Sequence, residues 1–385
     1  MTSIPIDPAT SPSAGTPAVQ SVASTAVAAL GWPDPARYLA FEKWLGDITF
    51  HAIDRDSARS ASADASFRRY FRFDTPAGPR IVMDAPPALE NCAPFVKIAA
   101  LLRGAGLNAP EVIEWNVVDG FLLLSDLGNK TYLSQLTDAS AQKLYVEALT
   151  ALVQMQGIGE DAARPLGLPV GLPTYDEPML RRELQLFPDW YITKHIGATL
   201  TPDEERKLSR CFDLIVQNAL AQPVSLVHRD FHSRNLMVCE GSGDTLAGTP
   251  LVNPGILDFQ DAVWGPMTYD VVSLLRDAYV ELTEEVQIDL AARYWERARA
   301  AGLPVAIDFG KFWSDFEWMG LQRHLKVLGI FARLSHRDGK HGYLADLPLV
   351  WKYAHHVCTR YQGLGPLAHL LERLAGTQRE VGYTF

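Results

Sequence analysis

A short polar stretch, residues 228–235, constrains the fold more than any other part of the chain. Two apolar runs flank it, residues 225–227 and 236–239, and their composition is typical of short β-strands. The polar residues between them therefore belong to a loop. A third apolar run, residues 255–257, leads directly into a carboxylate, Asp258. If the second and third runs pair as a hairpin, this carboxylate reaches the same cleft as the loop.

The loop reads HRDFHSRN and matches H-R-D-x-x-x-x-N, the catalytic loop of phosphoryl-transfer enzymes with a kinase architecture. Transfer of a phosphoryl group from ATP to a hydroxyl needs a carboxylate that orients the hydroxyl and accepts its proton, and Asp230 fits this role. The phosphates also need Mg²⁺, a hard cation that prefers oxygen ligands, and Asn235 and Asp258 fit as those ligands. A purely structural loop is disfavoured, because Asp258 and Phe259 form a D-F pair at the expected distance.

Two features of protein kinases are missing from the residues that precede this loop. There is no G-x-G-x-x-G stretch, and the strand that would carry the lysine of V-A-I-K reads IVMDAP at residues 81–86. Another cation has to screen the triphosphate, and Arg68, Arg69 and Arg72 are the candidates. Each of these arginines fits equally well on a solvated strand edge.

Residues 121–128 predict the last strand of a first lobe, followed by a hinge. Adenine usually pairs with main-chain groups of such a hinge. Ser125, Asp126 and Leu127 are therefore candidates for nucleotide binding through their backbone. An ordinary buried strand explains the apolar residues 122–124 equally well.

The order of the predicted elements indicates an α+β, two-lobed, kinase-like fold. Residues 1–33 are rich in Ala, Ser, Thr and Pro and have too little large apolar surface to offset the entropy lost on ordering, so they are expected to form a disordered tail. Residues 34–125 are expected to form a β-rich nucleotide-binding lobe, and residues 126–385 a larger helical lobe with the loop and the substrate site. The predicted elements include strands at 67–73, 80–83, 112–118 and 121–125, a helix at 91–103, and a later helix that opens with the capping box of Thr201 and Glu204.

Composition argues against several partners. The net charge is −10, so neither nucleic acid nor an anionic membrane surface is expected to bind. No apolar run approaches the roughly 20 residues of a membrane-spanning helix. The cysteines, Cys92, Cys211, Cys239 and Cys358, lie far apart, which favours reduced thiols and a cytoplasmic location. The sequence gives no signal for an oligomeric state.

Residues 228–237, Asp258 and the following Gly265-Pro266-x-x-Tyr269-Asp270 resemble the aminoglycoside phosphotransferase-like kinases. Within that superfamily, the stretches 64–72, 83–87, 258–263 and 322–329 are similar to the anomeric kinases of bacterial cell-wall recycling. This resemblance implies an ATP- and Mg²⁺-dependent enzyme that phosphorylates the anomeric hydroxyl of N-acetylmuramate and N-acetylglucosamine. It implies a small-molecule amino sugar as partner, and it agrees with the missing glycine loop and lysine.

Three further residues are candidate substrate contacts. Arg234, inside the loop, and Arg276, two turns into the helix after Asp270, could bind the lactyl carboxylate of a muramic acid, because guanidinium groups pair with carboxylates. Each could equally be a structural ion-pair partner. Asp261, close behind Asp258, is the third candidate. Asp270 itself is expected to brace the catalytic loop from the start of its helix.

Two other functions stay open at this level. The same scaffold could phosphorylate an aminoglycoside or an amino alcohol, and the net charge suits a polycation equally well. The other alternative is a nucleotide-binding regulator without turnover. The joint presence of Asp230, Asn235 and Asp258 argues against it, because a protein without turnover need not keep all three.

Overall fold

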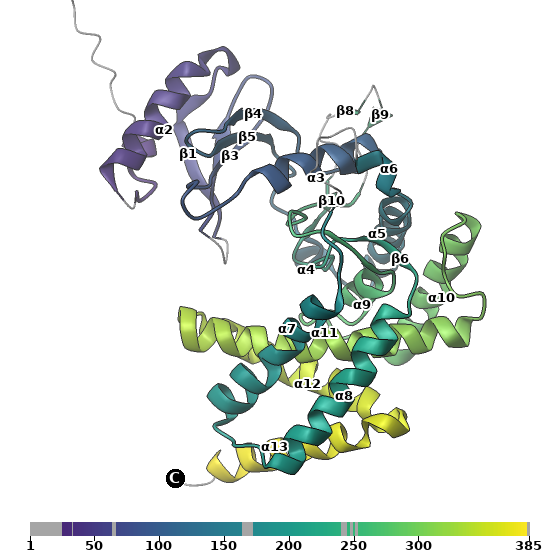
Figure 1. Ribbon diagram of the computed structural model, residues 1–385. Coiled ribbons are helices and arrows are strands. Elements are labelled where there is room, and N and C mark those ends of the chain that lie inside the picture. Colours follow the sequence, from purple (N-terminus) through teal and green to yellow (C-terminus); the bar gives the residue numbers. More distant parts are fainter. Residues whose placement is uncertain are drawn as a thin grey trace, which may run out of the picture.

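The computed structural model of the chain describes residues 25–32, 34–63, 67–163, 172–239, 245–246, 249–250 and 253–382. These residues form a sheet-containing lobe and a larger helical lobe (Figure 1), which confirms the predicted two-lobed α+β architecture. Residues 1–24 and 33 of the expected tail lie outside the described residues. None of the described helices combines the length and the apolar character that a membrane crossing requires.

The first lobe is built on a five-stranded antiparallel sheet with the strand order β1-β2-β3-β5-β4. Its elements are β1 (Asp54–Ala63), β2 (Arg69–Asp74), β3 (Arg80–Asp84), α3 (Ala93–Gly104), β4 (Val112–Asn116) and β5 (Phe121–Ser125). The last four strands and α3 confirm the predicted elements to within a few residues. The sequence pattern did not predict β1, because its sequence DRDSARSASA contains no β-branched or aromatic residue. This strand lies at the edge of the sheet, where polar residues are tolerated.

The two faces of the sheet pack against different parts of the molecule. On β5, Phe121 and Leu123 join a cluster with helices α1 (Thr25–Ala28) and α2 (Pro35–Asp47), whereas Leu122 and Leu124 join the large core that continues into the helical lobe. Successive side chains of a strand point to opposite faces, so a strand covered on both sides is apolar throughout. Burial on both faces of the sheet therefore explains why the run before the hinge, residues 121–124, is apolar throughout.

The first lobe begins earlier than the sequence indicates. Helix α1 falls inside the expected tail, and its Val27 is fully buried in the cluster beneath α2. The Trp32 ring lies against Phe41 and Phe71, with ring centroids 4.8 and 5.6 Å apart. Residues 25–32 therefore belong to the lobe and not to a disordered tail, because a few large side chains are enough to anchor them.

A buried carboxylate fastens α2 to the sheet. Asp84, at the end of β3, is fully buried and pairs with Arg37 of α2 at 2.5 Å and with Arg69 of β2. The Arg37 guanidinium also lies 3.9 Å from the centre of the Phe121 ring. These contacts fix α2 against the sheet, and they pair the charges of Arg37 and Arg69 with a buried carboxylate.

The second lobe is arranged around helix α11 (Phe309–Asp338). This helix packs against α7 (Glu177–Leu186), α8 (Pro202–Leu220), α9 (Tyr269–Leu275) and α12 (Leu347–Arg360). The capping box at the start of α8 is confirmed, since the Thr201 side chain accepts the Glu204 N–H and the Glu204 carboxylate accepts the Thr201 N–H. The first lobe also contains the short helix η1 (Thr49–His51). The remaining helices of the second lobe are α4 (Tyr132–Gln135), α5 (Ala141–Gln156), α6 (Glu160–Ala163), the π-helical η3 (Phe187–Ile196), α10 (Glu284–Ala300), η4 (His341–Asp346), η5 (Gln362–Leu364) and α13 (Gly365–Gly382).

Short strands hold the polar loop of residues 228–235. Strand β6 (Val224–Val227) pairs with β11 (Val263–Pro266), and β7 (Leu236–Met237) pairs with β10 (Gly255–Ile256), both antiparallel. A separate pair is formed by β8 (Thr245–Leu246) and β9 (Thr249–Pro250). The loop therefore leaves β6 and enters β7, and Asp258 follows β10, as the sequence predicts.

Helix α11 passes the end of α7 at a glycine. A Cβ atom added to Gly329 would lie 2.4 Å from the carbonyl carbon and oxygen of Leu186, which is too close for non-bonded atoms. We expect Gly329→Ala to force the helices apart and to lower the free energy of unfolding by about 1–3 kcal/mol in urea titrations.

The matched control is Gly376→Ala in α13, where a Cβ atom would have no neighbour within 4 Å. Alanine has the higher helix propensity, so this variant should gain about 0.5–1 kcal/mol. Equal unfolding free energies for the two variants would contradict the close approach at Gly329.

Candidate active site

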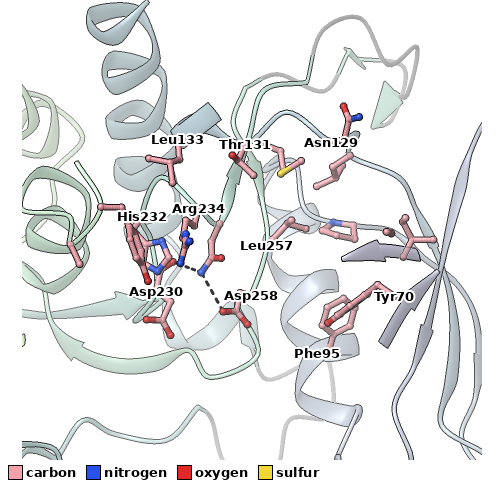
Figure 2. A pocket seen from close by; sticks show the side chains of 18 of the residues that line it. Tyr70, Phe95, Asn129, Thr131, Leu133, Asp230, His232, Arg234, Leu257 and Asp258 are labelled. Carbon is pink, nitrogen blue, oxygen red and sulfur yellow. Dashed lines mark hydrogen bonds between the residues drawn. The ribbon is translucent and has the colours of Figure 1, made fainter. Parts of the chain in front are cut away.

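A cavity of about 700 Å³ lies between the two lobes. Its lining comes from the sheet, the segment after β5, the loop of residues 228–235 and one side of α11. Figure 2 shows Asp230 and His232 towards one end and Tyr70 and Phe95 towards the other, with Asp258 between them. The cavity thus has a helical-lobe end and a sheet end.

The three side chains predicted to carry the chemistry meet in this cavity. The Nδ2 atom of Asn235 donates to the main-chain oxygen of Asp230 at 3.0 Å and to the Asp258 carboxylate at 3.2 Å. Gln260 donates to the other oxygen of Asp258 at 2.7 Å. Asp258 has a φ of 63°, a left-handed conformation that few residues other than glycine adopt. The two amide donors hold its carboxylate in place.

The predicted brace beneath the loop is confirmed. Asp270, fully buried at the start of α9, accepts the main-chain N–H of His228 at 2.6 Å and that of Arg229 at 3.0 Å. Burial raises the pKa of Asp270 to about 7, and the two N–H donors act in the opposite direction. Arg229 has a φ of 78°, so the brace stabilises a backbone conformation that is unfavourable by itself.

A second buried carboxylate, Glu183 of α7, holds the loop from the side. Arg229 donates to it at 2.6 Å, and Lys326 of α11 lies 3.0 Å from the same oxygen. The Tyr175 hydroxyl and the Gln322 amide donate to the other oxygen. Burial acts to raise the pKa of Glu183, but the charges of Lys326 and Arg229 hold it below its ordinary value. An ionised Glu183 therefore cross-links α7, the loop and α11.

Asp230 is also an anion in this setting. Burial acts to raise its pKa, but the positive charge of Lys326, with contributions from His232 and Arg323, lowers it below the ordinary value. Burial lowers the pKa of His228 to about 4, and the Nδ1 atom of this neutral imidazole accepts the N–H of Asp230 at 3.2 Å. A carboxylate that stays ionised can orient a hydroxyl group and receive its proton.

The oxygen atoms of Asn235 and Asp258 suit a hard divalent cation. Both hydrogens of the Asn235 amide are used by the bonds described above, and within the described residues its Oδ1 atom forms no hydrogen bond. Asp258 supplies an anionic oxygen next to it. Magnesium is commonly bound by one or two protein oxygens, with phosphates and water completing the octahedron. The donor set therefore fits Mg²⁺.

The sheet end of the cavity is apolar and contains the expected hinge. Ser125, Asp126 and Leu127 all line it. The Ser125 hydroxyl accepts the N–H of Glu111 at 2.8 Å, and the Asp126 carboxylate accepts two hydrogen bonds from Arg72, at 2.5 and 2.9 Å. These side chains hold the hinge in shape. The apolar lining consists of Tyr70, Ile81, Phe95, Pro110, Leu124, Met237 and Leu257.

Of the three arginines predicted to face phosphates, Arg72 lines the cavity and the other two do not. Arg69 is held by Asp84, as described above. Arg68 pairs with Glu90 at 3.1 Å, with both side chains largely buried. The expectation for Arg68 and Arg69 is therefore corrected, because buried carboxylates of the first lobe already bind them.

Of the three candidate substrate contacts, only Arg234 lines the cavity, with its guanidinium 4.1 Å from the centre of the Tyr279 ring. Arg276 is 1% exposed and pairs with Glu317 at 3.2 Å, outside the cavity lining. The end of α9 turns it into the core, where a charge is stable only with a partner. Asp261 is exposed and also lies outside the lining. These two expectations are corrected by the structure.

Helix α11 adds two cationic residues that the sequence analysis did not single out as site residues. Arg323 and Lys326 line the cavity, although they are only 3% and 6% exposed. Lys326 donates to the Tyr269 hydroxyl at 2.9 Å in addition to its contact with Glu183. A signal was present in the sequence QRHLK at residues 322–326, because charged residues inside an apolar helix imply buried partners.

A β-rich lobe and a helical lobe that enclose an aspartate and a pair of metal-type ligands define a phosphotransferase of the kinase-like class. Residues 57–303 match the model of the phosphotransferase enzyme family, and the chain belongs to this family. It is a phosphotransferase enzyme.

Relatives with assigned functions cover most of the chain. The N-acetylmuramate/N-acetylglucosamine kinase of Pseudomonas aeruginosa is 47% identical over 314 residues, which are 82% of this chain and 87% of the relative. A protein of the same name from Neisseria meningitidis serogroup B is 44% identical over 355 residues, 91% of this chain and 99% of the relative. The GDP complex of aminoglycoside 2'-phosphotransferase-IIIa superimposes with a TM-score of 0.54 at 14% identity, over 83% of this chain and 98% of that one. These similarities confirm the predicted kinase-like fold.

The brace under the loop can be tested with Asp270→Asn, which keeps the side-chain volume but replaces one acceptor oxygen with an NH₂ group. Because the loop that carries Asp230 should shift, we expect turnover to fall by about 10- to 100-fold. Nucleotide affinity, measured by calorimetry, should stay within about twofold, since the hinge is untouched. Unchanged turnover, or a loss of nucleotide affinity as large as the loss of turnover, would contradict this positioning role.

Proposed function

We propose that the protein is an ATP-dependent kinase that phosphorylates the anomeric hydroxyl of N-acetylmuramate and N-acetylglucosamine, in bacterial cell-wall recycling. The observation that supports this most strongly is the meeting of Asp230 with Asn235 and Asp258 in one cavity, in a chain 47% identical to a relative with this name. The product would be a sugar 1-phosphate. A cytoplasmic location belongs to the proposal, because ATP is the donor.

The geometry supports one role for each of these side chains. Asp230, ionised and fixed by the loop, orients the sugar hydroxyl and takes its proton as the oxygen attacks the γ-phosphorus of ATP and ADP leaves. Asn235 and Asp258 are the residues that would hold Mg²⁺, which neutralises charge on the phosphates when bound. The main chain of Ser125, Asp126 and Leu127 would receive the adenine ring, with the apolar lining on either side. Positioning and charge stabilisation supply most of the rate in such a transfer.

Arg72 is the best placed protein cation for the triphosphate. It lines the cavity, and its guanidinium is held by Asp126 and by the main-chain oxygen of Gly128 at 2.8 Å. A guanidinium fixed in this way offers a preorganised positive charge without the lysine of protein kinases. Arg68 and Arg69 have no part in this proposal.

The charges of the lining favour a neutral or acidic sugar over a polycationic acceptor. On the side of the helical lobe the lining contains three cationic residues, Arg234, Arg323 and Lys326, against two carboxylates, Asp230 and Asp258, and the latter is the proposed ligand of Mg²⁺. An aminoglycoside carries several ammonium groups and would meet positive charge on this surface. An uncharged amino sugar, or one with a carboxylate, does not have this penalty.

The chemical nature of the product tests the proposal. Purified protein with ATP and Mg²⁺ should phosphorylate both N-acetylhexosamines, and the phosphosugars should lack a reducing end and be labile in acid. Glucosamine and kanamycin, offered at the same concentration, serve as amine-bearing controls and should not be turned over. A reducing phosphosugar, or phosphorylation of kanamycin without the N-acetylated sugars, would overturn the proposal.

A further inference from the structure

One buried cation in the cavity differs from all the others described above. Arg323 of α11 is 3% exposed and lines the cavity, and its Nε and Nη1 atoms are buried without a hydrogen-bond partner among the described residues. Removing a guanidinium from water is unfavourable unless an anion or several acceptors replace the water. An unpaired arginine that faces a cavity therefore indicates an anionic ligand.

The other largely buried cations described above each have a carboxylate partner. Lys326, one turn further along α11, is bound by Glu183 and by the Tyr269 hydroxyl. Arg72 is bound by Asp126, and Arg276 by Glu317. No ion pair of this kind is found for Arg323 in the described part of the chain. Its charge is left for a group that enters the cavity.

The position of Arg323 separates it from the nucleotide end. In Figure 2, Asp258 lies between Asp230 and the apolar side chains Tyr70 and Phe95, so the transferred phosphoryl group belongs near Asp258. Arg323 lies on α11 in the helical lobe and lines the cavity together with Asp230, His232 and Arg234. It therefore faces the acceptor that Asp230 orients, and not the hinge.

The two sugars of the proposed function differ in one group. N-acetylmuramate carries a lactyl ether with a carboxylate on O3, where N-acetylglucosamine has a hydroxyl. We propose that Arg323 binds this carboxylate and so determines the use of the acidic sugar. The inference rests on the proposed function and deepens it. It assigns to Arg323 the contact that the sequence analysis expected from Arg234 or Arg276.

The test compares the two sugars in one variant. Arg323→Met keeps a long side chain and removes the charge. We expect kcat/KM for N-acetylmuramate to fall on the order of a hundredfold, because one partner of a desolvated charge pair is lost. For N-acetylglucosamine, kcat/KM should change by less than about threefold, since this sugar brings no carboxylate to the residue. Arg337→Gln, an exposed arginine on the same helix that pairs with Asp338, is the matched control and should leave both sugars unchanged.

Two further measurements exclude a merely structural role. Without sugar, Arg323→Met should melt at the same temperature as the wild type or higher, because an unpaired buried charge has been removed. Arg323→Lys, which keeps the charge, should retain N-acetylmuramate turnover better than Arg323→Met. The carboxamide of N-acetylmuramate, which is neutral, provides a second comparison. With the wild type, its kcat/KM should be as low as that of the acid with Arg323→Met. With Arg323→Met, the acid and the amide should have equal kcat/KM.

These measurements distinguish a failure of the Arg323 inference from a failure of the proposed function. An equal loss for both sugars would mean that Arg323 serves the phosphoryl group or the fold, and an unchanged ratio would mean that another residue binds the carboxylate; either result overturns the inference while the proposed function stands. Failure of the wild type to phosphorylate either sugar would overturn the proposed function and the inference with it.

Discussion

Asp270 accepts two main-chain N–H groups at the start of the loop of residues 228–235, and this contact fixes where the loop places Asp230 in the cavity. This loop conformation is energetically unfavourable by itself, because Arg229 has a positive φ. Glu183 provides a second restraint, because it pairs with the guanidinium of Arg229. Backbone strain at a site is stable only where the surroundings determine it, and here two buried carboxylates do so from α9 and α7. The position of Asp230 follows from them.

Buried carboxylates organise the rest of the molecule in the same way. Asp84 holds two arginines of the first lobe, Asp126 holds one at the hinge, and Glu183 joins three elements of the second lobe. Pairing of this kind offsets the desolvation of both partners and leaves little free charge inside. The missing glycine loop and lysine also do not leave the sheet end of the cavity without a cation, since Arg72 lines it beside Asp126 of the hinge. Charge that remains unpaired, as at Arg323, then marks a place for a ligand.

Much of this arrangement could be predicted from the sequence, and the failures have physical causes. The apolar runs and the spacing of Asp230, Asn235 and Asp258 are local signals, and they placed the loop, its flanking strands and the two lobes. Strand β1 was missed because an edge strand can be polar. The partners of Arg69 and Arg276 were missed because ion pairs join residues that are distant in the chain, such as Arg276 and Glu317. The importance of α11 was also missed, since a helical pattern does not tell which polar positions face a cavity.

The central claim is that Asp230 acts on the acceptor hydroxyl, while the nucleotide is held elsewhere. The most direct measurement is phosphotransfer and nucleotide affinity in Asp230→Asn, a change that keeps shape and removes the negative charge. The account predicts a loss of turnover of about 10²-fold or more, because the base is gone, with the affinity for ADP unchanged in calorimetry. A variant that keeps more than about a tenth of the wild-type turnover would contradict the role of Asp230 as the base.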